Sequence, residues 1–525
     1  MVQFGQHGAR KVLAKRSALV FVGAAMAVGS ATTATAGIIV ASSVIQASPT
    51  NSPFAAADAD GPPCNGVPGS AQTGRNFPGT ELEPFVAVNP ANENNLVGGW
   101  QQDRWSNGGS NATYYGYSTD AGTTWHNSSL QPKFSRCTGG GPNNGGDYER
   151  ATDPWVTVSP NGIAYSFALG FNQTLSAENA MLVSRSADGG NTWGPVTVLK
   201  RDTDVNVFND KNSITADPTN SNYVYAVWDR LEFPREQASP RAAERALGYR
   251  GPTWFSRTID GGATWETSRI ILDPGQVNQT IGNEIVVTGR GELVNGFDLI
   301  YNFKNAHKVR GLNVAVQRST DRGATWSQAT VVDKLLSVGV SDPTFGSPVR
   351  TGDIIPSWAT DPRPGQRVVY ATWQDSRATG GARDQIAFAK SSDGGATWTT
   401  LSYAINTDHS TPAFTPRIHV MPDGTIGILH YDFRHDDGGA PLVTSTWLLH
   451  SHDGGTTWQE TNVGADFDMS SGARASGYFV GDYLGLTHSN GAFVPFFAVA
   501  NGATANPPNS ISAMPASDIF ASRVS

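Results

Sequence analysis

The sequence predicts an all-β fold, a β-propeller of four-stranded antiparallel blades, with seven blades favoured and six as the alternative. Three observations support this prediction: six copies of one turn motif, pairs of strand-like segments that alternate with the motif, and an almost complete lack of helical patterns. The 525 residues include 58 Gly and 31 Pro, as is typical of a globular protein rich in turns. With 14 Trp and only 16% charged residues, the composition argues against disorder.

The repeated turn motif has the pattern S/T-x-D-x-G-x-T-W, and we call it the Asp-box. Its six copies carry the aspartates Asp120, Asp188, Asp260, Asp321, Asp393 and Asp453. Successive aspartates lie 60 to 72 residues apart, which is enough chain for one four-stranded unit with its loops. The Asp carboxylate of such a turn accepts backbone N–H groups, and the Gly supplies a positive φ. The Asp-boxes are therefore predicted to be structural, each joining the two outer strands of a blade.

A second repeat, a pair of inner strands, alternates with the Asp-boxes. It occurs for a seventh time at residues 481–500, followed by the strand-like segment 518–524 but by no Asp-box. We expect the stretch before Glu83 to supply the missing strand of this unit and close the ring, because closure removes exposed sheet edges. In the alternative, a six-bladed ring forms and the last pair folds elsewhere. The one helical pattern is 235–247, inside an insertion at 231–250.

The N-terminus is typical of a targeting segment. Four basic residues precede an apolar stretch at 17–28, and Ala34-Thr35-Ala36 offers a cleavage site. We predict a signal peptide at 1–36, a linker and ring-closing segment at 37–80, and the propeller at 81–525. The alternative is an uncleaved anchor, because 37–45 prolongs the apolar stretch. Both interpretations predict a monomer that is secreted or held at the cell surface.

Net charge indicates which macromolecules the protein can bind, and the cysteine content predicts a disulfide. Loss of residues 1–36, with four basic and no acidic groups, takes the formal charge from −8 to −12. So acidic a protein is a poor partner for nucleic acid, and we expect membrane contact only through an uncleaved N-terminal segment. The only two cysteines, Cys64 and Cys137, are predicted to form a disulfide, as is usual in exported proteins. We predict no metal site and no cofactor.

The predicted topology places a site at the end of the sheets opposite the Asp-boxes. There the second strands of the blades end in Asp and Arg, and the first strands begin with charged residues. The strand starts contribute Glu83, Glu149, Arg150, Asp153, Glu284, Asp353, Arg417 and Asp482. Paired carboxylates suit glycoside cleavage, and Arg binds carboxylates bidentately.

Within this group we predict three catalytic carboxylates: Asp229, Asp375 and Asp432. The predicted substrate-binding residues are Arg104, Arg230, Arg377, Arg434, Asp210, Lys211 and Tyr483. The alternative interpretation is structural, because an Asp–Arg pair that recurs from blade to blade also suits a brace between neighbours. The insertion at 231–250 is long enough to cover the site as a lid.

The Asp-boxes resemble the bacterial neuraminidase repeats of the sialidase-like propellers, over a region from about Glu83 to the C-terminus. This resemblance implies a propeller and a carbohydrate partner. The F/Y-R-I-P motif of sialidases does not precede the first Asp-box, and the nearest strings are FPRE at Phe233 and TPRIHV at Thr415. We expect a secreted glycoside hydrolase of sialidase-like type. The alternatives are a non-catalytic propeller that binds glycan or protein, and a polysaccharide lyase.

Overall fold

The computed structural model describes residues 41, 43–54, 64, 72, 74–173, 178–233, 250–301, 311–464, 466–502 and 516–525. The chain divides into two units, 1–38 and 39–525, and all described residues belong to the second. The predicted signal peptide and the helical pattern at 235–247 lie outside the described residues. Within the described ranges, no helix is long and apolar enough to cross a membrane.

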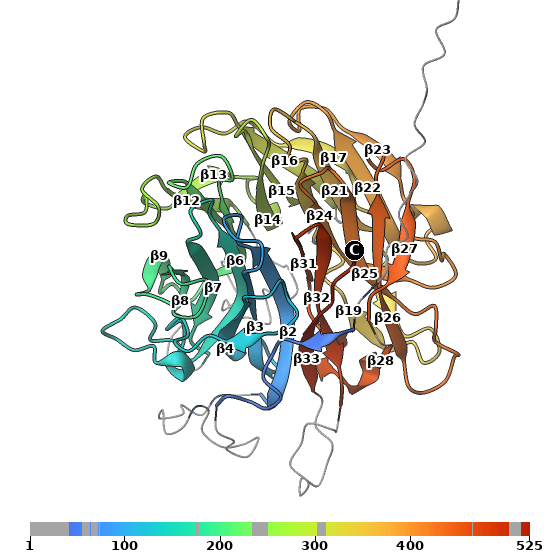
Figure 1. Ribbon diagram of the computed structural model, residues 1–525, viewed down its shortest axis with the longest axis horizontal. Helices are drawn as coiled ribbons and strands as arrows, with labels where there is room; N and C mark the ends of the chain where they lie inside the picture. Colours follow the sequence, from blue (N-terminus) through green and yellow to red (C-terminus); the bar gives the residue numbers. More distant parts are fainter. Residues whose placement is uncertain are drawn as a thin grey trace, which may run out of the picture. The chain divides into compact units, whose positions relative to one another are not determined.

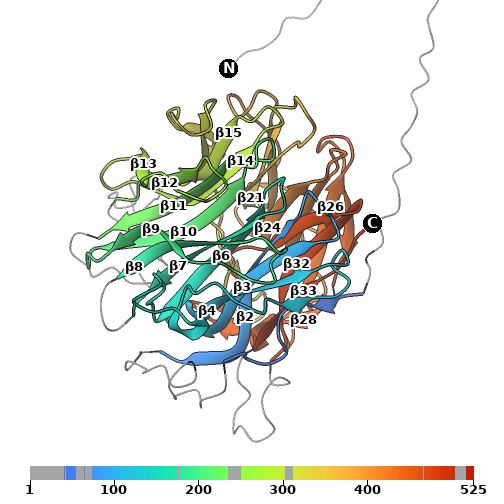
Figure 2. The same cartoon turned by 60° about the vertical axis from the view of Figure 1, so that its left-hand side comes forward.

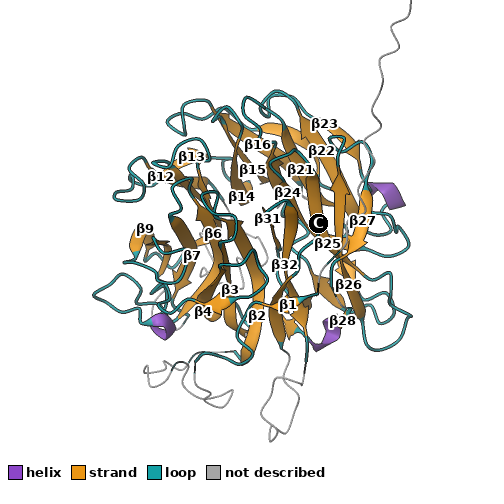
Figure 3. Cartoon of the chain, in the orientation of Figure 1, coloured by secondary structure: helices purple, strands orange, loops and turns teal. Residues whose placement is uncertain are grey.

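The described part of the chain is all-β, as predicted, with three one-turn 3-10 helices: η1 (Arg136–Thr138), η2 (Arg377–Thr379) and η3 (Met469–Ser471) (Figure 3). Four sheets are built on meanders of four antiparallel strands that follow chain order, and the last of them carries one further short strand (Figure 1). The first consists of β10 (Val207–Ala216), β11 (Val224–Glu232), β12 (Thr253–Thr258) and β13 (Arg269–Leu272). The second consists of β14 (Gln279–Val287), β15 (Leu293–Ile300), β16 (Asn313–Ser319) and β17 (Thr330–Lys334). The other two are β20 (Ser357–Thr360), β21 (Val369–Asp375), β22 (Gln385–Ser391), β23 (Thr399–Ser402), and β24 (Ala413–Val420), β25 (Ile426–Asp432), β26 (Val443–Ser451), β27 (Gln459–Asn462).

Two further meanders are linked into one larger sheet. They are β2 (Asn76–Val88), β3 (Leu96–Trp105), β4 (Ser110–Ser118), β5 (His126–Asn127), and β6 (Arg150–Val158), β7 (Ala164–Phe171), β8 (Asn179–Ser186), β9 (Thr197–Asp202). The link between them is a single pair, Ser110 with Ala151. The C-terminal strands β31 (Gly485–Ser489), β32 (Ala492–Ala500) and β33 (Ser517–Ala521) join the same sheet where Ser517 pairs with Thr80 of β2.

The N-terminal strand β1 (Ile45–Gln46) lies beside the last strand of the chain. It pairs antiparallel with β33, with Ile45 opposite Ala521. An isolated bridge between Ala41 and Val524 extends this contact. The two ends of residues 39–525 therefore share one group of strands.

A small sheet brings distant segments together. It consists of β18 (Val340–Ser341), β19 (Pro348–Arg350), β29 (Ala473–Arg474) and β30 (Tyr478–Phe479), and β28 (Phe467–Asp468) pairs separately with β26. Strand β19 runs parallel to β30, with Arg350 opposite Phe479. This pairing carries Arg350 from the connection between β17 and β20 towards the C-terminal strands.

Every Asp-box lies between the third and fourth strands of its meander, as the sequence predicts. In the first Asp-box, Ser118 Oγ donates to Asp120 Oδ1 at 2.8 Å and accepts from the N–H of Gly122 at 2.9 Å. Asp120 also accepts from Thr124 N and Thr124 Oγ1, at 2.8 and 2.6 Å. The same four bonds recur in the other five Asp-boxes. These carboxylates are thus occupied in holding their own turns.

The first strand of each meander lies innermost, as does β31. Strands β2, β6, β10 and β14 follow one another in space (Figure 2). Together with β20, β24 and β31 they line one cavity, which we call the inner channel. Its wall is mostly apolar and includes Val86, Val156, Ile214, Val286 and Ile418. One end of this channel leads to the candidate site.

Candidate functional site

A β-bulge recurs in the innermost strands near their starts. In β6, β10, β14 and β24 the register with the next strand shifts at one step, and in β2 it shifts at two, the second between Leu82 and Phe85. The residues at these steps are Glu83-Pro84, Asp153-Pro154, Lys211-Asn212, Gly282-Asn283 and Thr415-Pro416. The first residue of each step is left-handed, with φ of 53°, 54°, 43°, 69° and 52° in that order. A left-handed non-glycine residue costs about 1–3 kcal/mol and is concentrated at functional sites, where bulges re-aim side chains.

The bulges bring acidic and basic side chains together around one lysine. Lys211 Nζ lies 2.7 Å from Asp482 Oδ2, 3.7 Å from Asp153 Oδ2 and 3.8 Å from Glu83 Oε1. Arg350 Nε donates to Asp482 Oδ1 at 2.8 Å. We call these five residues the Lys211 cluster. The carboxylates of the cluster are at most 5% exposed and the lysine side chain 10%, so their charges interact with little screening by solvent.

Beneath the Lys211 cluster lies a second layer, which we call the Arg417 floor: Phe85, Trp155, Glu284, Ser357 and Arg417. The two terminal nitrogens of Arg417 donate to the two Glu284 oxygens at 2.8 and 2.7 Å. The guanidinium lies over the rings of Phe85 and Trp155, 4.6 and 5.2 Å from their centroids, and the two rings stack. Because Trp155, Glu284 and Arg417 line both the site and the inner channel, they separate the two.

Two adjoining cavities lie at this site, and Lys211 lines both. The aromatic cavity is lined by residues that include Trp155, Asn212, Arg417 and Tyr483. The charged cavity is lined by residues that include Glu83, Arg104, Asp153, Asp210 and Arg350. The buried atoms in these walls include Asp153 Oδ2, Asn212 Oδ1 and Arg417 Nε, which have no hydrogen-bond partner among the described residues. Buried polar atoms nearly always have partners, so these three make the cavities candidates for binding a polar ligand.

Burial sets the protonation of the cluster. It raises the pKa of Glu83 to about 8, with Lys211 opposing the shift and the neighbouring carboxylates Asp153 and Asp482 adding to it. Burial, together with the charge of Asp153, likewise raises the pKa of Asp210 to about 7. For Asp482, Arg350 and Lys211 outweigh burial and hold the pKa well below its usual value. Near neutral pH the site therefore offers a protonated Glu83 beside an ionised Asp482.

The lysine remains charged. Burial alone would lower the pKa of Lys211, but the carboxylates of Asp153, Asp482 and Glu83 outweigh it and raise the pKa well above its usual value. An ammonium group is a hydrogen-bond donor and a counter-charge and has no lone pair for attack on a substrate. Lys211 therefore holds the carboxylates together and does not act as a nucleophile.

Four of the predicted site residues line these cavities. Asp210, Lys211 and Arg104 line the charged cavity, and Tyr483 lines the aromatic cavity beside Lys211. Arg104 also lies over the ring of Phe479, 5.2 Å from its centroid. These four predictions depended on where the strands begin and end, which the repeat defines well.

The three predicted catalytic carboxylates lie elsewhere. Asp229, Asp375 and Asp432 are 0% exposed and line neither cavity. Asp229 accepts from the N–H of Gly282 in the next sheet at 2.9 Å, and burial raises the pKa of this carboxyl well above its usual value. Asp375 accepts from Trp373 Nε1 at 3.1 Å. These carboxylates are braces, because their oxygens are already used within the protein, and we assign them no catalytic role.

The arginines that follow these aspartates are braces too. Arg377 Nε donates to Asp375 at 2.8 Å, and Arg434 Nε donates to Asp432 at 2.5 Å. Arg230 pairs with Asp202 at 2.9 Å. None of the three arginines lines either cavity. The contacts of these three arginines therefore fit the structural interpretation, in which an Asp–Arg pair braces the fold.

Several site residues can be recognised in the sequence by their position at the start of an innermost strand. Glu83, Asp153, Glu284, Arg417 and Asp482 belonged to the wider group of strand starts but were not selected from it. The stronger signal was a charged residue followed by Pro or Asn near the start of an innermost strand, because that dipeptide forms the bulge. Arg350 had no repeat signal, since it reaches the site only through the pairing of β19 with β30.

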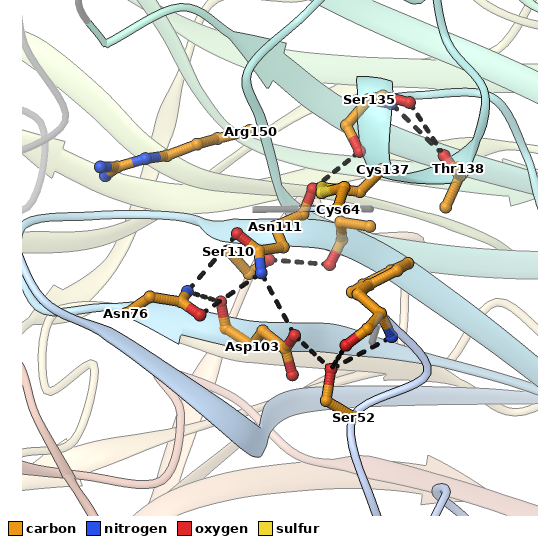
Figure 4. Close-up of a disulfide and its surroundings, with 12 residues drawn as sticks. Ser52, Cys64, Asn76, Asp103, Ser110, Asn111, Ser135, Cys137, Thr138 and Arg150 are labelled. Atoms are coloured by element: carbon orange, nitrogen blue, oxygen red, sulfur yellow. Dashed lines mark hydrogen bonds between the residues drawn. A yellow bond between two sulfur atoms is a disulfide. The ribbon is translucent and has the colours of Figure 1, made fainter. Parts of the chain in front are cut away.

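The N-terminal segment is tied to the wall beside this site (Figure 4). A disulfide joins Cys64 and Cys137, whose Cα atoms lie 5.0 Å apart. Ser52 Oγ donates to Asp103 Oδ2 at 2.6 Å, and Asn111 Nδ2 donates to the same oxygen at 3.2 Å. These contacts fasten the segment after β1 to β3 and β4. Among the described residues, no group of three or more His, Cys, Asp or Glu side chains is arranged to hold a metal ion.

A comparison with known protein families finds a match for part of the chain. Residues 253–478 match the family described as the BNR repeat-like domain, which confirms the resemblance that the Asp-boxes predict. No curated protein matches the chain.

Solved structures with a similar arrangement include an α-L-arabinanase of Penicillium chrysogenum in complex with arabinobiose. It is 13% identical, the match covers 74% of this chain and 94% of that one, and the TM-score is 0.44. A Hadza microbial sialidase is 15% identical, with coverage of 77% and 74% and a TM-score of 0.45. An ulvan lyase, described as a new family of polysaccharide lyase, is 12% identical, with coverage of 73% and 79% and a TM-score of 0.41.

Proposed function

We propose that this chain, which carries a BNR repeat-like domain, hydrolyses glycosidic bonds of a carbohydrate bound in the cavities around Lys211. The observation that carries the proposal is the Lys211 cluster itself. Glu83 and Asp153 share one ammonium, with oxygens 3.8 and 3.7 Å from Lys211 Nζ, so their carboxyl groups are near neighbours, as the paired carboxylates of glycoside hydrolases are. Their environments also differ, as an acid and a base at one site require.

The roles of Glu83 and Asp153 follow from the protonation state of Glu83 and from the oxygen of Asp153 that has no hydrogen-bond partner among the described residues. Glu83, whose pKa burial raises to about 8, is the general acid that protonates the leaving oxygen. Asp153 is the nucleophile or base, because its Oδ2 has no hydrogen-bond partner within the protein. Lys211 and Asp482 position these two groups and keep the cavity charge balanced.

The test is a panel of 4-nitrophenyl glycosides that includes α-sialosides and α-L-arabinofuranosides. We expect turnover of at least one member, lost in Glu83→Gln and Asp153→Asn. Asp375→Asn is the matched control, because this buried carboxylate is a brace. Turnover that survives in Glu83→Gln and Asp153→Asn would contradict the assignment. Binding of a sugar with no turnover of any glycoside would favour the non-catalytic alternative.

We also propose that the fold is a closed seven-bladed ring. This is supported by the seven innermost strands that line one channel and by the pairing of β1 with β33, which adds an N-terminal strand to the last group. Removal of residues 41–54 should then lower the melting temperature by many degrees. A truncated chain as stable as the full one would argue for the six-bladed alternative.

Export to an oxidising compartment is a further proposal. It is supported by the targeting pattern of residues 1–36 and by the disulfide, since disulfides persist mainly outside the cytosol. The measurement is the mass of the protein recovered from the medium or cell surface. We expect a chain that begins after Ala36 and labels with no thiol reagent until it is reduced.

A further inference from the structure

We infer that Asn212 and Arg417 bind hydroxyl groups of the sugar in the aromatic cavity and so determine which sugar is accepted. This inference rests on the proposed function and names the residues that read the part of the substrate away from the reacting bond. Both residues line the aromatic cavity, and they are only 3% and 8% exposed. Each has one buried polar atom without a hydrogen-bond partner, Asn212 Oδ1 and Arg417 Nε.

The orientation of the Asn212 amide is determined by its own partners. Asn212 Nδ2 donates to the carbonyl oxygens of Asp153 and Phe167, at 2.9 and 3.5 Å. Carbonyl oxygens only accept, so the nitrogen must face them and the amide cannot be flipped. Asn212 Oδ1 is therefore a hydrogen-bond acceptor whose position the bulge at Lys211 holds.

The guanidinium of Arg417 is fixed from two sides. Its two terminal nitrogens are engaged by Glu284, and its plane lies against Phe85 and Trp155. It cannot turn to satisfy Nε without losing these contacts. The brace arginines differ, because Nε of Arg377 and Nε of Arg434 each donate to a neighbouring aspartate. Arg417 Nε is therefore a buried donor in the wall of the aromatic cavity that no described residue satisfies.

One acceptor and one donor beside aromatic rings suit a sugar hydroxyl. A hydroxyl both donates and accepts, whereas a carboxylate only accepts and an ammonium only donates. Trp155 and Tyr483 supply the apolar surface against which a sugar ring packs. A ligand that lacked the hydroxyl would leave both protein atoms buried and unpaired, which costs affinity.

The experiment compares two variants with two matched controls. Arg417→Lys keeps the positive charge beside Glu284 but removes Nε, and Asn212→Ala removes the acceptor. The controls are Arg434→Lys, in a brace, and Asn209→Ala, in the same strand as Asn212. Asn209 Oδ1 already accepts from Trp228 Nε1 at 2.9 Å. The probe is the 4-nitrophenyl glycoside that the wild-type protein cleaves fastest.

We expect KM to rise about tenfold in Arg417→Lys and in Asn212→Ala, with kcat within about twofold of wild type, because the lost bonds are equally strong before and during reaction. The controls should lower the melting temperature and leave KM unchanged. Wild-type KM in the folded Arg417→Lys and Asn212→Ala proteins would overturn the inference.

A second measurement tests the inference without the variants, in case one of them does not fold. Monodeoxy versions of the same glycoside are tested on the wild-type protein, and removal of one hydroxyl should raise KM about tenfold. Equal KM values across the deoxy series would overturn the inference.

Failure of the proposed function gives a different result. If no glycoside is cleaved, saturation-transfer NMR with free galactose, glucose and arabinose compares the wild type with Arg417→Lys. A signal that is lost in Arg417→Lys supports the inference although hydrolysis is refuted. Equal signals, or no signal with any sugar, overturn it.

Discussion

Asp432 and Asp153 are both buried carboxylates beside a cationic side chain, but their surroundings differ. Asp432 accepts from Arg434 Nε at 2.5 Å and from Trp447 Nε1 at 3.0 Å. Asp153 lies 3.7 Å from Lys211 Nζ, its Oδ2 has no hydrogen-bond partner, and its backbone is left-handed. Asp432 is hydrogen-bonded in a backbone without left-handed strain, whereas Asp153 has an oxygen without a described hydrogen-bond partner in a strained one.

Whether a buried carboxylate is hydrogen-bonded within the protein distinguishes structural residues from site residues better than residue type does. The Asp–Arg pair of Asp432 recurs at Asp375. Among the described residues, the arrangement around Lys211 occurs once, because each innermost strand contributes a different side chain at the bulge. Contacts that recur in more than one sheet belong to the scaffold, whereas the candidate site consists of contacts that occur once.

Replacement of Lys211 gives the largest expected effect. Lys211→Met would leave Glu83, Asp153 and Asp482 without their shared counter-charge, and breaking a buried pair in this way costs about 3–5 kcal/mol of stability. We expect urea unfolding to show this loss at pH 7.5 and a smaller one at pH 5, where protonation relieves the repulsion. Equal losses at the two pH values would mean that the carboxylates do not depend on the ammonium.

The pH dependence of the reaction tests the acid. Glu83 must be protonated to act, and burial raises its pKa to about 8, so kcat/KM should fall about tenfold per pH unit above pH 8. Because the folded-state pKa lies above the unfolded value, its contribution to stability is complete below about pH 4.5 and is lost as the pH rises through 8. Glu83→Gln should flatten this loss in melting temperature. A kcat/KM profile that is level to pH 10 would exclude Glu83 as the acid.

A brace variant should show the opposite behaviour. Asp432→Asn weakens charge-assisted hydrogen bonds with Arg434, so we expect a loss of about 1.5–3 kcal/mol in unfolding free energy. Activity in the folded fraction should match that of the wild type, because Asp432 lines neither cavity. Loss of turnover without loss of stability would return Asp432 to the list of catalytic residues.

The smallest effect is expected in an Asp-box. Asp260→Asn weakens the bonds from Thr264, and we expect a cost of about 1 kcal/mol with unchanged activity. Hydrogen bonding lowers the pKa of Asp260 to about 2, so its stabilising effect is present above about pH 4 and is lost as the pH falls towards 2. Thermal unfolding at pH 7 and pH 2.5 measures both statements, and an effect that grows on acidification would contradict them.

The sequence by itself determined the parts of this protein that depend on local chemistry. The spacing of the Asp-boxes predicted the meanders, since the Ser, Asp, Gly and Thr of each turn bond to residues at most four positions away in the chain. Strand order then indicated which end of the sheets gathers Arg104, Asp210, Lys211 and Tyr483. These inferences needed only residues that are neighbours in the chain.

Only the tertiary structure decided which carboxylates are available. Asp229 is a brace because Gly282 and Asn283, more than 50 residues away in the sequence, take its oxygens. Arg350 reaches Asp482 because two short strands from distant connections pair in parallel. Whether a buried acid becomes a brace or part of a site depends on which side chains of the neighbouring sheets satisfy it, and no local sequence pattern encodes that.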